Sequence, residues 1–169
     1  MKLKTDFTIN GKYYKAGDEV SGLYIFPFFL IHMLAFGGSG FLMAYFADDI
    51  SVSMLYAHGG IAITVYLVFY LAIFGLDAVK WMFINAGIGL FGIYSELRIF
   101  LKYFDKNIAD FAWYIHVVPF TYYVLYTFLI YQAVLSFFGA YKSRGRKKLV
   151  DTMYILISLV IYLWIFLKG

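Results

Sequence analysis

Five long apolar runs, joined by short polar connections, account for most of this 169-residue chain. They cover residues 24–46, 54–76, 81–101, 111–138 and 152–167. A helix needs about 20 mostly apolar residues to cross roughly 30 Å of hydrocarbon, because each residue adds about 1.5 Å of rise. The first four runs reach that length and the fifth is slightly shorter. The pattern predicts an all-α integral membrane protein, with a bundle of five transmembrane helices in residues 23–169.

Residues 1–22 are much more polar, and charged residues such as Lys12 and Asp18 interrupt any apolar stretch. Within them, the pair Asn10-Gly11 stands between alternating residues of the segment 7–14. This pair is a strong signal for a two-residue hairpin turn. We therefore expect a short N-terminal segment outside the membrane that contains a small β-hairpin.

Composition and charge support a membrane location and predict an orientation. Apolar residues make up 63% of the chain and charged residues 14%, which leaves too little polar surface to coat a soluble globule. Lysine and arginine accumulate in short cytoplasmic loops, and the densest basic stretch is residues 142–148. Counting through five alternating spans puts the N-terminus in the cytoplasm and the C-terminus outside, as in a protein of the bacterial inner membrane. The net charge of +4 then follows from topology, so we expect a lipid bilayer and no nucleic acid as partner.

Cysteine is absent from the sequence. Disulfides, thiolate-bound iron–sulfur clusters and covalently attached c-type haem are therefore excluded. Any redox cofactor would have to be held by histidine, methionine or carboxylate side chains.

The three histidines lie inside apolar runs. Burying an ionisable group at such a position costs free energy, so each histidine marks a candidate functional site. His58 and His116 each stand just inside the outer end of their run, and Glu96 falls near the same depth. His32 lies near the middle of the first run. Pro119 follows His116 by three residues and cannot donate a backbone hydrogen bond, so we expect a kink beside this histidine. Two imidazoles and one carboxylate are thus predicted to gather in the outer half of the bundle.

Helical phase predicts which side chains of the third run face other helices. At 100° per residue, Asn85, Gly89, Gly92 and Glu96 form one narrow polar stripe. The glycine spacing from Gly87 to Gly92 matches the dinucleotide-binding fingerprint, but no strand precedes it as that motif requires. We therefore expect these glycines to allow close packing of helices. The same role is expected for the glycines of the first two runs: Gly37, Gly38, Gly40, Gly59 and Gly60.

A b-type haem is one chemistry that this set of residues could support. It requires two imidazoles from facing helices at one depth, glycines that admit a flat macrocycle, and cations for the propionates. His58 and His116 would be the axial ligands, and Arg98 and Lys102, four residues apart, would hold the propionates. The sequence thus predicts a small redox subunit of the membrane with haem b near the outer face.

Several alternatives stay open. A transition metal could bind His58, His116 and Glu96, with Met43 as a further ligand. A quinone pocket could use a histidine, Glu96 and nearby tyrosines, with Glu96 handling protons. The histidines, together with Asn85, could instead bond between helices in a structural subunit of a larger membrane complex or a homo-oligomer, or line the proton or ion path of a small oligomeric transporter. His32 would then hold a second cofactor or make a structural bond.

The segment from Leu30 to Phe41, which carries His32 followed by Gly37, Gly38 and Gly40, resembles the first helix of small haem-b membrane proteins of the protoporphyrinogen oxidase kind. The resemblance covers this single helix. The lysine that follows in that oxidase has no counterpart near His58. The resemblance implies neither a substrate nor an activity.

Overall fold

The computed structural model describes residues 2–9, 11–47 and 51–168, and it is almost entirely helical. Its contacts divide the chain into two compact units, Met1–Leu129 and Ile130–Gly169, which are described separately. The first unit contains the N-terminal hairpin, four helices and most of a fifth. It holds every residue that the sequence singles out as a candidate ligand.

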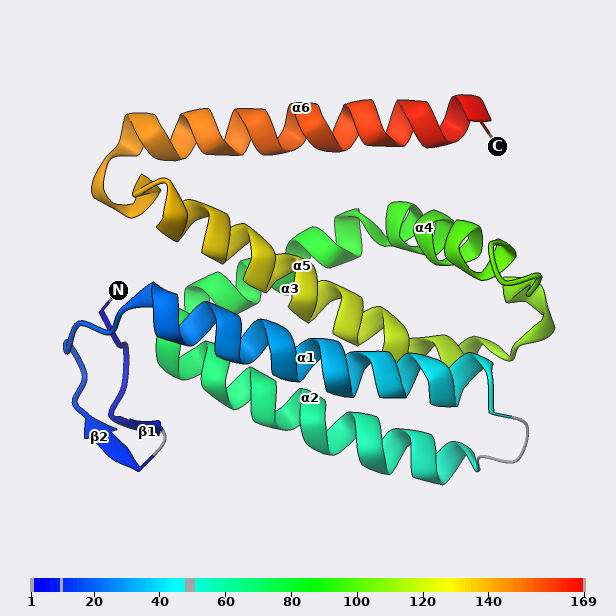
Figure 1. The fold of residues 1–169 in the computed structure, drawn as a ribbon, viewed down its shortest axis with the longest axis horizontal. Coiled ribbons are helices and arrows are strands. Elements are labelled where there is room, and N and C mark those ends of the chain that lie inside the picture. Colours follow the sequence, from blue (N-terminus) through cyan, green and yellow to red (C-terminus); the bar gives the residue numbers. More distant parts are fainter. Residues whose placement is uncertain (1, 10, 48–50, 169) are drawn as a thin grey trace. The chain divides into compact units, whose positions relative to one another are not determined.

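The predicted hairpin is confirmed. Strands β1 (Phe7–Ile9) and β2 (Lys12–Tyr14) pair antiparallel, with Phe7 opposite Tyr14. Gly11 has φ +75°, which suits the turn, while Asn10 lies outside the described residues. The backbone N–H of Lys4 donates to the carbonyl of Ala72 at 2.9 Å, so the tail is attached to the C-terminal end of the second helix (Figure 1).

The first two apolar runs form an antiparallel pair of helices, α1 (Gly22–Tyr45) and α2 (Val52–Phe74), which lie side by side in Figure 1. Serine side chains cap both N-termini, because Ser21 accepts from the N–H of Leu23 and Ser51 from that of Met54, each at 3.3 Å. Both predicted spans are confirmed as continuous helices.

The third run was predicted to form one helix, and the structure has two helices there. It forms α3 (Leu76–Ile88) and α4 (Leu90–Lys102), whose axes are bent by 69° at Gly89. Glycine weakens a helix, and a Cβ on Gly89 would lie 3.2 Å from the carbonyl oxygen of Asn85. The expected polar stripe is therefore divided between two helices. The expected packing role is also wrong for Gly87, since a Cβ there would meet nothing within 4 Å.

The fourth run was predicted to be one helix from residue 111, but its α-helix begins only at Val117. Two short 3₁₀ helices, η1 (Ile108–Asp110) and η2 (Trp113–His116), precede α5 (Val117–Phe137). Pro119 falls in the first turn of α5, where a missing N–H removes no helical bond, so it starts the helix and does not kink it. His116 consequently sits at the entrance to α5 and not inside it.

A buried hydrogen bond joins three helices of the first unit. The hydroxyl of Tyr70, whose side chain is fully buried, donates to the carbonyl of Leu125 at 2.8 Å and lies 3.1 Å from Sδ of Met33. Glycines allow these helices to approach closely, because a Cβ on Gly37 would lie 3.1 Å from the ring of Tyr122. The predicted packing role is confirmed for Gly37, Gly40 and Gly59, but Gly38 and Gly60 border open space.

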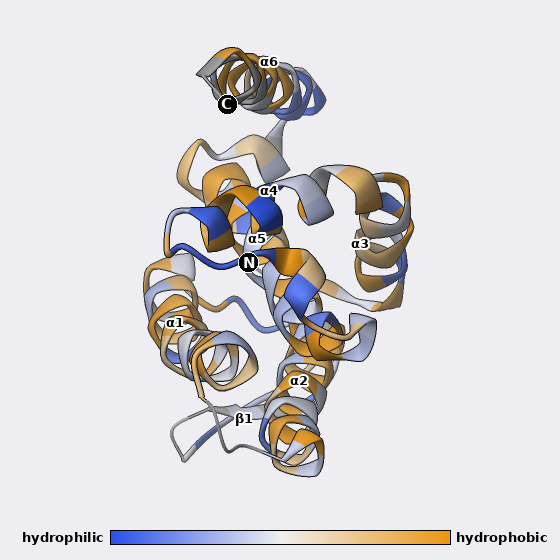
Figure 2. Ribbon diagram, turned by 90° about the vertical axis from the view of Figure 1, so that its right-hand side faces the viewer, coloured by the Kyte–Doolittle hydropathy of each residue, from blue (hydrophilic) through white to orange (hydrophobic). Residues whose placement is uncertain are grey.

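Three helical segments are long and apolar enough to cross a membrane: Ile25–Tyr45, Val52–Phe74 and Trp113–Phe137. The bent pair α3 and α4 passes the same test as a broken span or a re-entrant loop. Large apolar side chains are exposed, with Ile61 70% and Ile88 80% exposed, and Figure 2 shows that hydrophobic residues recur along α2 and α3. These features are consistent with a multi-pass membrane protein. The five-helix bundle stays a prediction.

The second unit contains the end of α5, a turn at Gly139, η3 (Ala140–Lys142) and α6 (Arg144–Lys168). Leu135, Ala140 and Val150 form a small core. Tyr131 donates to Asp151 at 2.6 Å. Burial raises the pKa of Tyr141 in the turn to about 12, so this phenol stays protonated and donates to Gln132.

Candidate functional site

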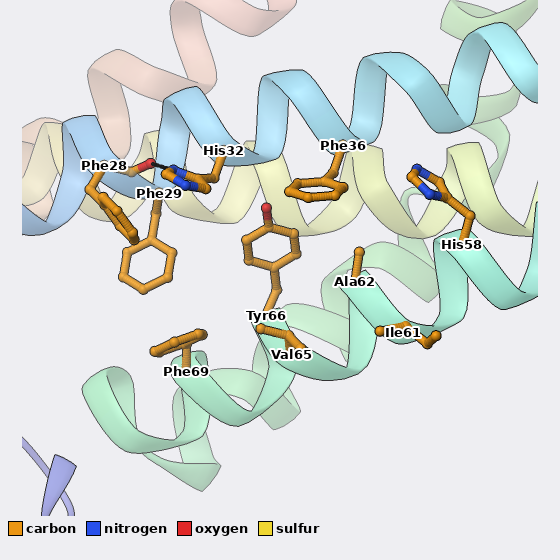
Figure 3. Close-up of a pocket in the computed structure, with 10 residues that line it drawn as sticks. All are labelled: Phe28, Phe29, His32, Phe36, His58, Ile61, Ala62, Val65, Tyr66 and Phe69. Atoms are coloured by element: carbon orange, nitrogen blue, oxygen red, sulfur yellow. Dashed lines mark hydrogen bonds between the residues drawn. The ribbon is translucent and has the colours of Figure 1, made fainter. Parts of the chain in front are cut away.

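A slot between α1 and α2 brings two of the three histidines to one cavity. Its volume is about 330 Å³, within the range typical of small-molecule pockets. Figure 3 shows His32 and His58 in a row with Phe36 between them, and Tyr66 and Phe69 opposite. We call this cavity the histidine slot; it is lined by Phe28, Phe29, His32 and Phe36 of α1, and His58, Ile61, Ala62, Val65, Tyr66 and Phe69 of α2.

The periodicity of the two helices explains the composition of the slot. On α1, Phe28, His32 and Phe36 stand four residues apart, so they share one face within roughly 80°. On α2, the lining residues from His58 to Phe69 recur at spacings of three and four, the pattern of a single helix face. Aromatic rings at these positions fill both walls and keep the slot apolar.

The hydrogen bond of His32 determines which of its nitrogens is free. Nδ1 lies 2.9 Å from the backbone carbonyl oxygen of Phe28, and a carbonyl can only accept. Nδ1 therefore carries the hydrogen, and in the neutral ring Nε2 holds an unshared lone pair. The ring also packs on that of Phe28, with centroids 4.1 Å apart. His32 thus lines the slot as a hydrogen-bond acceptor.

The same reasoning applies to His58. The Ser39 hydroxyl donates to the carbonyl of Phe36 at 2.9 Å and lies 2.9 Å from Nε2 of His58. Because its single hydrogen is used on the carbonyl, the hydroxyl must accept from Nε2–H. Nδ1 of the neutral His58 ring is then unprotonated. Both histidines of the slot offer an acceptor nitrogen, and each is held in position by α1.

Tyr66 adds a third polar group to the slot. Its side chain is 4% exposed, and in Figure 3 its hydroxyl points into the space between His32 and Phe36. Within the described part of the chain this hydroxyl forms no hydrogen bond. It is therefore free to donate to a bound molecule or to accept from one.

His116 does not line the histidine slot. Its Nδ1 lies 2.9 Å from the hydroxyl of Tyr45 on α1, and the backbone of Ile108 and Phe111 also hydrogen-bonds its ring. His58 and His116 thus have separate partners on α1, which lie six residues apart in the sequence. The structure gives no direct support to a haem between them, because His58 lines the histidine slot and His116 does not.

The other predicted ligands are also separated. The hydroxyl of Tyr123 donates to Oε2 of Glu96, so this carboxylate lies with tyrosines but with no histidine. Met43 is half-buried on α1, whereas Asn85, Arg98 and Lys102 are exposed on α3 and α4. Among the residues that the structure describes, no three histidine or acidic side chains are placed to hold a metal ion. The haem and metal sites therefore stay predictions.

Sequence reasoning missed the aromatic walls of the slot and the pairing of His32 with His58. The recurrence of Phe28, His32 and Phe36 at one-turn intervals was a usable signal. The prediction paired His58 with His116 because both stand near the outer ends of their runs. Position along a helix does not specify the direction in which a side chain points.

We found no match between this chain and any protein-family model, any curated protein or any solved structure. The arrangement of its own residues therefore carries the functional proposal.

Proposed function

We propose that this chain binds the head group of a lipid-soluble quinol in the histidine slot, as a redox-type subunit of a bacterial inner membrane with its N-terminus in the cytoplasm. The observation that carries the proposal is the pair of imidazoles on one aromatic cavity, each with an unprotonated nitrogen. A cavity of this kind between apolar helices suits a ligand that arrives through the lipid.

A hydroquinone ring matches the chemistry of the slot. Its two hydroxyls donate from opposite ends of a flat ring, and the acceptors here are His32 and His58. Ser39, which holds His58, stands seven residues after His32, or about 10 Å along α1. A ring with a hydrogen bond of about 2.8 Å at each end spans a distance of this order. Phe28 and Phe36 would stack on the ring, and the isoprenoid tail would extend into the bilayer.

An imidazole with a free nitrogen also suits the proton chemistry of a quinol. A hydroquinone hydroxyl becomes a far better electron donor when its proton is taken up, and an imidazole with a free nitrogen is a suitable base near neutral pH. The two histidines would therefore bind the reduced form more tightly than the oxidised form, which offers only acceptors to their lone pairs. Redox function would further require an electron acceptor on a partner subunit.

Substitution of the slot histidines tests this proposal. We expect His32→Leu and His58→Leu each to weaken binding of decylhydroquinone about fivefold, since each removes a hydrogen bond worth about 1 kcal/mol. His116→Leu is the matched control, because it also removes an imidazole bonded to an α1 hydroxyl but lies outside the slot. The measurement is anaerobic calorimetric titration of the full chain in detergent. Equal binding by wild type and both slot variants would contradict the proposal, as would an equal loss in the control.

A structural subunit is the second candidate, and one observation favours it. All three histidines already have a partner within the chain, namely Phe28, Ser39 and Tyr45. In that case the purified protein would bind no hydroquinone. The histidine substitutions would then lower only the unfolding temperature or the yield of a complex with other membrane subunits.

A further inference from the structure

A second cavity lies on the other side of α1. It has a volume of about 450 Å³ and is lined by residues of α1, α4 and α5. Its α1 residues include Leu34, Gly37, Gly38 and Phe41, which at 100° per residue point roughly opposite to His32 and the histidine slot. We call it the Glu96 pocket, after the one charged residue among the side chains that line it.

We propose that the Glu96 pocket binds a monovalent organic cation with an apolar body, such as a quaternary ammonium or phosphonium group or a protonated tertiary ammonium group. This inference is independent of the quinol site, because the two cavities share no lining residue.

The first support is the uncompensated carboxylate. Glu96 lies on a helix of the bent pair and is half-buried. In the part of the chain that the structure describes, its polar contact is the hydroxyl of Tyr123 on α5, and no lysine or arginine pairs with it. Arg98 and Lys102 are exposed, and they leave α4 on the opposite side from Glu96. A carboxylate in apolar surroundings is costly unless a positive charge compensates it.

The second support is the ring of aromatic side chains around the carboxylate. Phe41, Phe100, Tyr122, Tyr123 and Tyr126 all line the pocket. The faces of aromatic rings attract cations, and a group of such rings is the usual recognition site for quaternary ammonium ligands. The remaining walls are apolar, with Leu34, Leu97 and Pro119 among them, and these would cover the apolar body of the cation.

Other occupants fit these observations less well. A fatty acid or phosphate would bring a negative charge to Glu96. A neutral acyl chain would leave the carboxylate uncompensated. A bare metal ion would find one carboxylate and neutral phenols, and no cluster of three ligands is present among the described residues.

The proposal is tested by binding of tetraphenylphosphonium to the detergent-purified full chain, measured by calorimetric titration. We expect Glu96→Gln to weaken binding at least tenfold, and Glu19→Gln, which removes an exposed carboxylate of the N-terminal segment, to leave it unchanged. Gly38→Leu provides a second route, because a Cβ at Gly38 meets nothing within 4 Å and the leucine would extend into the pocket. This variant should also weaken binding without disturbing the helix contacts.

Two outcomes would overturn the proposal. One is equal affinity of wild type and Glu96→Gln for tetraphenylphosphonium. The other is equally tight binding of neutral triphenylphosphine oxide, which would show an apolar cavity without charge selectivity. The variant His32→Leu should keep full affinity for the cation, so failure of the quinol proposal and failure of this one are distinguishable.

Discussion

Single glycines control how closely the helices of the first unit approach one another. A Cβ on Gly59 of α2 would collide with Val118 of α5, whose Cγ2 would lie 3.1 Å away. The neighbouring Gly60 borders open space, with nothing within 4 Å of a Cβ. Two adjacent glycines of one helix therefore have different roles, and only one of them is needed for packing.

This difference yields a matched pair of variants. Gly59→Ala should lower the free energy of unfolding by about 1–3 kcal/mol, because α2 and α5 must separate to admit the methyl group. Gly60→Ala should leave stability unchanged or raise it by about 0.5 kcal/mol, since alanine is the better helix former. Thermal unfolding of both variants in the same detergent provides the comparison. Equal effects at the two positions would contradict the close packing at Gly59.

The histidines show what residue-level reasoning from sequence could and could not predict. Position in an apolar run predicted that the histidines lie on or beside the apolar helices, and the structure has His32 exposed and His58 and His116 half-buried there. The partner of each imidazole was not predictable, because it depends on how the helices are rotated about their axes. Ser39 and Tyr45, both on α1, hold His58 and His116, and no local pattern in the sequence indicates these pairs.

Among the elements, the N-terminal hairpin depends on one carboxylate. Asp6 accepts from the hydroxyl of Tyr13 at 2.7 Å and from the N–H of Ala16 at 2.8 Å. These bonds, first that of Tyr13, lower the pKa of Asp6 below its ordinary value of 3.8. The ionised form is therefore stabilised in the folded hairpin. Its contribution is fully present above the ordinary pKa and is lost as the pH falls through the lowered value.

Hydrogen exchange measures this dependence. The N–H of Ala16 should be protected at neutral pH and lose protection in acid, as Asp6 takes up a proton. Tyr13→Phe removes the main cause of the shift, so the loss should then begin at a higher pH. Protection of Ala16 that is independent of pH in both proteins would contradict the role of Asp6.

The third apolar run shows why hydropathy predicts a span more readily than a straight helix. Glycine contributes little to the polarity of the segment 81–101, so the run looks continuous. The same glycines weaken the helix, and at Gly89 it bends. The hairpin was easier to predict, since the pair Asn10-Gly11 specifies a turn by local chemistry alone.

At the scale of the whole molecule, the two cavities of the first unit collect different polar groups. The histidine slot collects acceptor nitrogens, whereas the Glu96 pocket collects a carboxylate and tyrosines. The sequence predicted one shared site in the outer half of a five-helix bundle. The bend between α3 and α4 turns Glu96 toward α5, and α1 separates it from the histidines. The side of the membrane on which the C-terminus lies stays a prediction, because the bent pair counts as one crossing or as none.

The most direct test of the quinol proposal compares two ligands with the same ring and the same tail. Decylhydroquinone can donate two hydrogen bonds, whereas its dimethyl ether can donate none. We predict that the wild-type chain binds the hydroquinone at least tenfold more tightly, and that the difference falls in His32→Leu and His58→Leu but persists in His116→Leu. Equal affinity of the wild type for the two ligands, or a preference that survives both slot substitutions, would contradict the assignment of His32 and His58 as the acceptors of a quinol.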